Sequence, residues 1–144
     1  MEFSDLSTAN QTRLPQFKNR QGKPAHSQPN GHDWSIAEWT NAMAGEAGEA
    51  CNIAKKLIRG DYTDEKEGIV ELLKELADVV IYADLCAQRV GMPLEIAIVQ
   101  KFNEVSKRVG SSVQLGTEEE RAATPAHNKP SVLSWRPASA GESD

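Results

Sequence analysis

Cysteine is scarce in this sequence of 144 residues, which contains only Cys51 and Cys86. Two cysteines are too few for a disulfide-stapled secreted scaffold or for a four-cysteine zinc site. We expect both to be reduced, buried thiols, because free cysteine is among the residue types that proteins bury most often. A four-cysteine zinc site and a disulfide framework are therefore excluded.

Long apolar runs and an excess of basic residues are also lacking. No segment approaches the roughly 18 apolar residues that span a bilayer, and the opening MEFSDLSTANQTR lacks the apolar core of a secretory signal. The sequence has 16 Lys and Arg against 21 Asp and Glu, so no broad basic face can neutralise a phosphate backbone. We expect a cytoplasmic, soluble protein without a membrane or nucleic-acid partner.

Aromatic residues make up 6% of the chain and apolar residues 39%, which is lean for a fully packed globule. Residues 1–33 mix Pro and Gly with Asn, Gln, Ser and His and show no helical or strand period, so we expect an arm or loop there. Residues 116–144 are again Pro-rich, and we expect a disordered tail. One helical domain over residues 34–115 remains between them.

The pattern of this middle segment is helical throughout. Ser35 followed by Glu38 forms a capping box that predicts a helix running to about residue 59, where Gly60 stops it. Apolar residues at three- and four-residue steps predict a second helix over about 64–90 and a third over about 93–109. No segment reads as a strand. The predicted fold class is all-α, an antiparallel helical hairpin plus a third helix.

The predicted hairpin brings four acidic residues close together. A turn centred on residue 62 places Glu46 opposite Asp78 and Glu49 opposite Glu75. Three residues rise about 4.5 Å, so the four carboxylates would form one compact patch on the facing sides of two helices. The same register keeps the two cysteines apart, which excludes an intrachain disulfide. Acidic pairs at this spacing also occur elsewhere, so solvated acids paired with lysines remain an open alternative; those lysines are Lys55, Lys56 and Lys74.

A buried patch of four carboxylates needs cations, because unpaired buried charge is costly. Hard oxygen ligands without cysteine or histidine suit Mg2+, with Mn2+ as a substitute. A bundle di-iron site would need Glu-x-x-His on two helices, whereas the three histidines lie outside the predicted helices. We therefore interpret them as loop residues rather than ligands; they are His26, His32 and His127.

The segments AGEAGEACNIAKK, KELADVVIYADL and KFNEVSKR together resemble the MazG-like, all-α nucleoside triphosphate pyrophosphohydrolases, over roughly residues 34–110. The branch that looks most similar includes dCTP pyrophosphatases and short phage or bacterial MazG-like proteins. One departure is Gly45, which stands where many members have the first of two adjacent glutamates. An extra acid available as a base is therefore missing.

The resemblance implies Mg2+-dependent hydrolysis of nucleoside triphosphates to monophosphate and pyrophosphate, in the role of nucleotide-pool housekeeping. By the same resemblance, Glu46, Glu49, Glu75 and Asp78 match the metal ligands, with Glu46 or Glu49 orienting the attacking water. Candidate substrate-binding residues are Lys55, Lys56, Tyr82, Lys101, Asn103 and Trp34. Solvated surface charge is the alternative for each lysine. Trp39 could stack on a base, but its place in the apolar stripe favours packing.

No Walker-type phosphate loop occurs in the sequence, so the metal ions must bind the phosphates of the substrate. Base discrimination should be modest, and the resemblance favours deoxynucleotides with pyrimidines best. The second helix is apolar over a wide arc, which predicts at least a dimer with a four-helix-bundle core. The resemblance implies a homodimer or homotetramer. Two alternatives stay open: a non-catalytic helical interaction module, and a metal-binding regulator without turnover.

Overall fold

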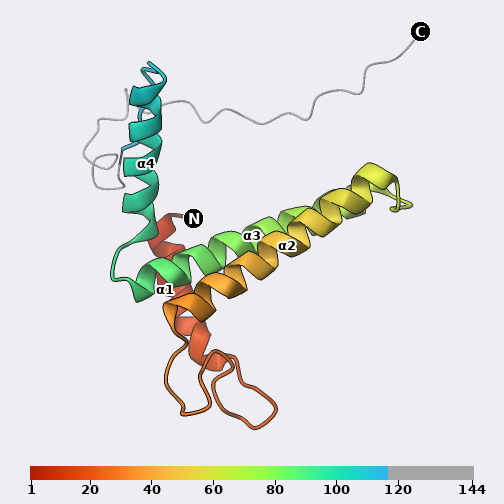
Figure 1. Cartoon of the computed structure of the whole chain (residues 1–144), viewed down its shortest axis with the longest axis vertical. Coiled ribbons are helices and arrows are strands. Elements are labelled where there is room, and N and C mark those ends of the chain that lie inside the picture. The colour runs from red at the N-terminus through yellow and green to blue at the C-terminus, as the bar shows by residue number, and fades with distance from the viewer. Residues whose placement is uncertain (117–144) are drawn as a thin grey trace.

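The computed structural model describes residues 1–116, which form four α-helices and a short 3-10 helix, without a β-strand in that range (Figure 1). In chain order these are α1 (Phe3–Arg13), η1 (Leu14–Gln16), α2 (Ile36–Arg59), α3 (Glu65–Arg89) and α4 (Leu94–Arg108). The predicted all-α class is confirmed. The tail expected over residues 116–144 lies, from residue 117 onward, outside the described residues.

The two longest helices, α2 and α3, form the antiparallel hairpin that the sequence predicts. The side chain of Ser35 accepts a hydrogen bond from the backbone N–H of Glu38, which closes the capping box at the start of α2. Gly60 ends α2 in the left-handed conformation at φ 72°, which a residue without a Cβ adopts at little cost. Asp64 then caps α3. The sequence signals therefore place both ends of the turn correctly.

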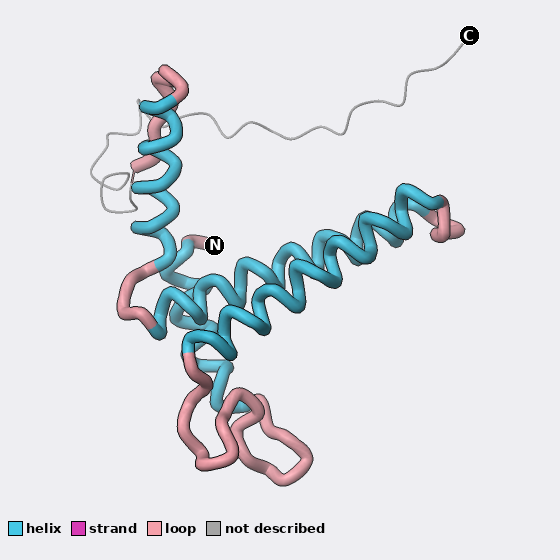
Figure 2. Tube along the Cα trace, in the orientation of Figure 1, coloured by secondary structure: helices cyan, strands magenta, loops and turns pink. Residues whose placement is uncertain are grey.

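The N-terminal segment differs from the expectation of an arm or loop. Residues 3–13 form α1, which packs against α3, and only residues 17–35 form a loop (Figure 2). Glu2 and Asp5 close a capping box at its start. The helix escapes a periodicity search because it has almost no apolar face and the residue that it buries is the polar Asn10.

The hairpin has a thin core, and the apolar stripe along α3 is only partly covered. The buried apolar side chains of the described residues are Trp39, Ala50, Ile53 and Leu85. Ile69 and Leu76, which belong to this stripe, are 44% and 47% exposed. In one chain only α2 covers this part of α3, so the outer face of the stripe is open to solvent (Figure 1).

Helix α4 begins after Pro93 and points away from the hairpin in Figure 1. It contacts α3 and α1 but makes no contact with α2. Residues 111–116 turn back along it, held by Asn103, whose side-chain amide pairs with both backbone groups of Leu115 at 2.8 and 2.9 Å. Both cysteines are free, as predicted, but neither is fully buried: Cys51 is exposed and Cys86 is half-buried.

Candidate metal centre

Three carboxylates converge where α2 and α3 face each other. Glu46 on α2 and Glu75 and Asp78 on α3 each offer an oxygen, and these oxygens all lie within 4.8 Å of one another. Glu75 and Asp78 share a face because three residues make nearly one helical turn. The antiparallel register brings Glu46 against them, as the turn centred on residue 62 predicts.

The carboxylates of this triad repel one another, and none of the described ion pairs joins them to a basic side chain. Burial raises the pKa of Glu46 above its ordinary value, and neighbouring carboxylates raise it further; these belong, in order of effect, to Asp78, Glu49 and Glu75. A cation among these groups would reverse the repulsion.

The lysine pairs of the alternative interpretation are not formed among the described residues. The ion pairs among residues 1–116 are Arg59 with Asp61, Arg89 with Asp33, and Lys101 with Glu104. None of them involves the triad. The donor set is three carboxylates and lacks sulfur and imidazole, which fits a hard divalent cation such as Mg2+.

Glu49, the fourth predicted ligand, lies one turn further along α2 and is not within the triad's close set of oxygens. It is exposed and lines an open hollow with Gly45, Gly48 and Lys55. Its charge still reaches Glu46, because it contributes to the raised pKa of that residue. Lys55 is exposed and Lys56 half-buried, and neither makes an ion pair with the described acids.

An aromatic cluster adjoins the triad at Tyr82, one turn beyond Asp78 on α3. The Tyr82 hydroxyl lies 3.3 Å from Nε2 of His26, which comes from the loop over residues 17–35. The His26 ring stacks on Trp39 at 5.2 Å between centroids and meets Trp34 edge-on at 4.8 Å. Burial, and then the charges of Glu46 and Asp78, raise the pKa of Tyr82 above its ordinary value.

Trp39 is completely buried, which supports packing as its main role. The guanidinium of Arg89 covers its ring at 4.3 Å and pairs with Asp33 of the loop at 3.0 Å. Within the described part of the chain, the buried atoms Nε1 of Trp39 and Nδ1 of His26 have no hydrogen-bond partner. Burial, followed by the charge of Arg89, lowers the pKa of His26, so the neutral ring is favoured.

Sequence reasoning placed His26 correctly in a loop but did not foresee that it stacks in this cluster. No periodic signal could have found it, since it stands alone in a segment rich in proline and glycine. Trp34 and Tyr82, both predicted to bind substrate, do meet in the cluster around His26.

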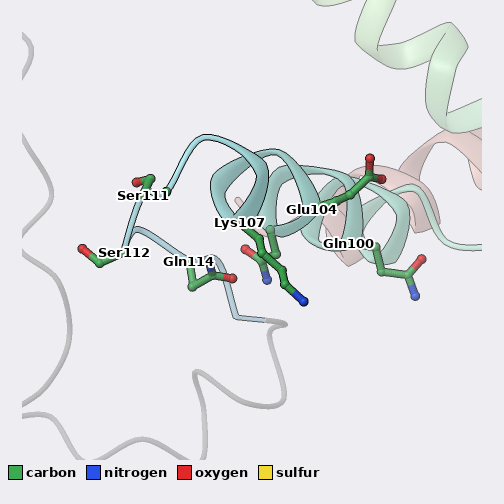
Figure 3. A pocket seen from close by; sticks show the side chains of 8 residues that line it. Gln100, Glu104, Lys107, Ser111, Ser112 and Gln114 are labelled. Carbon is green, nitrogen blue, oxygen red and sulfur yellow. The ribbon is translucent and has the colours of Figure 1, made fainter.

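The predicted substrate-binding residues of α4 are not brought to the triad within one chain. Lys101 pairs with Glu104 at 2.9 Å, and the amide of Asn103 is engaged with Leu115. Figure 3 shows Lys107 beside the returning segment that carries Ser111, Ser112 and Gln114, where Asn103 helps to line a separate polar hollow. None of the residues that line this hollow belongs to the triad, so the two places are distinct.

Comparison with protein-family models, with curated proteins and with solved structures found no match for this chain. None of the helices in residues 1–116 combines the length and apolarity needed to cross a membrane.

Proposed function

We propose that this protein is a Mg2+-dependent nucleoside triphosphate pyrophosphohydrolase of the MazG-like kind, converting deoxynucleoside triphosphates to monophosphate and pyrophosphate. The observation that carries the proposal is the triad of Glu46, Glu75 and Asp78, three carboxylate oxygens within 4.8 Å on facing helices without a compensating basic side chain among the described ion pairs. Such a donor set suits a hard cation, and a polyphosphate is the substrate that such a cation binds well.

In this reaction the oxygen of a water molecule bonds to the α-phosphorus while the bond from that phosphorus to the bridging oxygen breaks, and pyrophosphate leaves with that oxygen. When bound, Mg2+ would neutralise phosphate charge and lower the pKa of the attacking water. Glu46, Glu75 and Asp78 would hold the cation. Glu49, exposed one turn away, is free to orient the water and accept its proton or to complete the ligand set.

The aromatic cluster supplies a place for the nucleobase next to the triad. Trp34 and Tyr82 present rings at its edge, and stacking accepts any base. A close wall against the 2′-hydroxyl is enough to favour deoxyribose. Lys55 and Lys56 follow Glu49 along α2 and would meet the outer phosphates, whereas Lys101 and Asn103 would have to reach a site from a second copy of the chain.

The test is pyrophosphate release from the eight common nucleoside triphosphates, with and without Mg2+. We expect cleavage of several deoxynucleotides, pyrimidines best, and none after chelation of the metal. Asp78→Asn should lower turnover on the order of a hundredfold or more, because it removes a charge from the cation site while nearly preserving shape. Glu67→Gln is the matched control, since this acid is exposed in the first turn of the same helix.

Three results would count against the proposal. Turnover that survives in both Asp78→Asn and Glu46→Gln would remove the triad from the chemistry. Mn2+ binding without hydrolysis of any nucleotide would instead favour a metal-binding regulator, and absence of both would favour a helical interaction module.

A further inference from the structure

A buried carboxylate joins the N-terminal helix to the hairpin. Asp84, on α3, is 1% exposed, and its Oδ2 accepts two amide hydrogen bonds of 2.7 Å. One comes from Nδ2 of Asn10 on α1, which is itself 3% exposed, and the other from Nε2 of Gln88 one turn further along α3. Hydrogen bonds to a buried charged group are strong and depend on orientation, and removing one partner is costly.

The same network reaches a second residue of α1. Nε2 of Gln88 also lies 3.0 Å from Oγ of Ser7 and 3.3 Å from its carbonyl oxygen. Helix α1 has almost no apolar face, and Asn10 is the residue that it buries. Polar contacts to Asp84 and Gln88 therefore fix where α1 sits on α3.

The loop over residues 17–35 is held by the same turns of α3. Tyr82 contacts His26, and Arg89 donates to Asp33 while covering the ring of Trp39. Only η1 separates α1 from this loop, so the anchorage of α1 determines where the loop begins. Asp84 and Gln88 thus lie on α3 between Tyr82 and Arg89, the two residues of this helix that contact the loop.

We propose that Asn10, Asp84 and Gln88 form a latch that positions the loop, and with it His26 and Trp34, against Trp39 and Tyr82. These are positioning residues, which act through the loop. The proposal concerns the arrangement of the N-terminal segment and does not depend on the reaction proposed above.

Asn10→Asp tests the latch, because it sets a second carboxylate against Asp84 in a buried place and removes the amide donor. We expect hydrogen exchange of the α1 amides to accelerate on the order of tenfold or more, as the helix detaches more often. The NMR signals of the His26 ring should move toward free-histidine values, because the ring loses its stack on Trp39. Gln11→Glu adds the same charge at the next, exposed position of α1 and should change neither readout beyond about twofold.

The exchanged pair Asn10→Asp with Asp84→Asn is the rescue. The new amide at position 84 can donate one hydrogen to the carboxylate at position 10 and the other to Oε1 of a Gln88 amide turned over. The pair therefore again contains one buried charge, bound by an amide donor from the facing helix. Both readouts should return toward the unmodified protein. The proposal is overturned if Asn10→Asp leaves α1 exchange unchanged, or if α1 exchange rises while the His26 signals stay in place. Equal loss of protection across α2 would also overturn it, since the change would then be general unfolding.

Discussion

At the scale of single residues, Glu46 shows most clearly how folding and chemistry oppose each other. Its pKa is raised by burial and by neighbouring carboxylates, so the folded state binds its proton more tightly than the unfolded chain does. A carboxyl group with a raised pKa destabilises the fold once it is ionised. This destabilisation disappears as the pH falls through the folded-state pKa of Glu46 toward the ordinary value of the group.

This linkage gives a pH-dependent prediction for Glu46→Gln. Without divalent metal, the variant should be more stable than the parent above the folded pKa of Glu46, and this advantage should shrink as the pH is lowered toward about 4.5. Urea unfolding across this range, with both proteins in chelator, measures the difference. Saturating Mg2+ should abolish the advantage or reverse its sign, because it stabilises only the intact triad. A difference that is flat with pH would show that Glu46 does not carry the repulsion.

At the scale of elements, the hairpin could be predicted because the signals that end its helices lie close together in the sequence. Ser35, Gly60 and Asp64 act through their own backbone neighbours, so they reveal the helix ends without any knowledge of the fold. The register then brought Glu46 to Asp78, and the candidate metal centre follows from it. Glu49 lies outside the close set of oxygens, because helix faces rotate by about 100° per residue and two opposed pairs need not converge equally.

Helix α1 and the placement of the loop were beyond prediction for a different reason. Their anchorage depends on single polar contacts, Asn10 with Asp84 and His26 with Tyr82, between residues far apart in the sequence. A lone asparagine or histidine in a polar segment carries no periodic pattern. The all-α class, the hairpin and the triad are thus readable from the sequence, while the aromatic cluster that adjoins the triad is not.

Two glycines of the hairpin, one near the turn and one in the middle of α2, allow a matched pair of substitutions. A Cβ at Gly68 would lie 2.5 Å from Cδ2 of Leu57 and 2.7 Å from Cδ2 of Tyr62, so Gly68→Ala must displace side chains packed at the turn. We expect it to lower the free energy of unfolding by about 1–3 kcal/mol. A Cβ at Gly48, in the middle of α2, meets nothing within 4 Å among the described residues, and Gly48→Ala should raise stability by about 0.5–1 kcal/mol. Equal effects in denaturant unfolding would refute the close packing at the turn.

At the scale of the whole molecule, the described part of a single chain leaves much of its apolar surface in water. Along α3, Val70, Leu73 and Val80 are 50%, 59% and 42% exposed, on the helix that was predicted to be apolar over a wide arc. Helix α4 adds Phe102 at 40%. Large exposed apolar surfaces mark interaction sites, and an antiparallel hairpin paired with a second copy gives a four-helix core.

We therefore predict that the protein is at least a dimer in which the exposed face of α3 packs against the same face of another copy. Light scattering should give at least twice the chain mass of 15.8 kDa at micromolar concentration, and the melting temperature should rise with protein concentration. Leu73→Gln should weaken assembly by a factor on the order of a hundred to ten thousand, because each symmetric interface loses two buried leucines worth about 1.5–3 kcal/mol each. Lys74→Gln introduces the same side chain at the adjacent exposed position and should leave assembly intact. A monomer at these concentrations, or equal weakening by both variants, would mean that the apolar face of α3 is not what joins the copies.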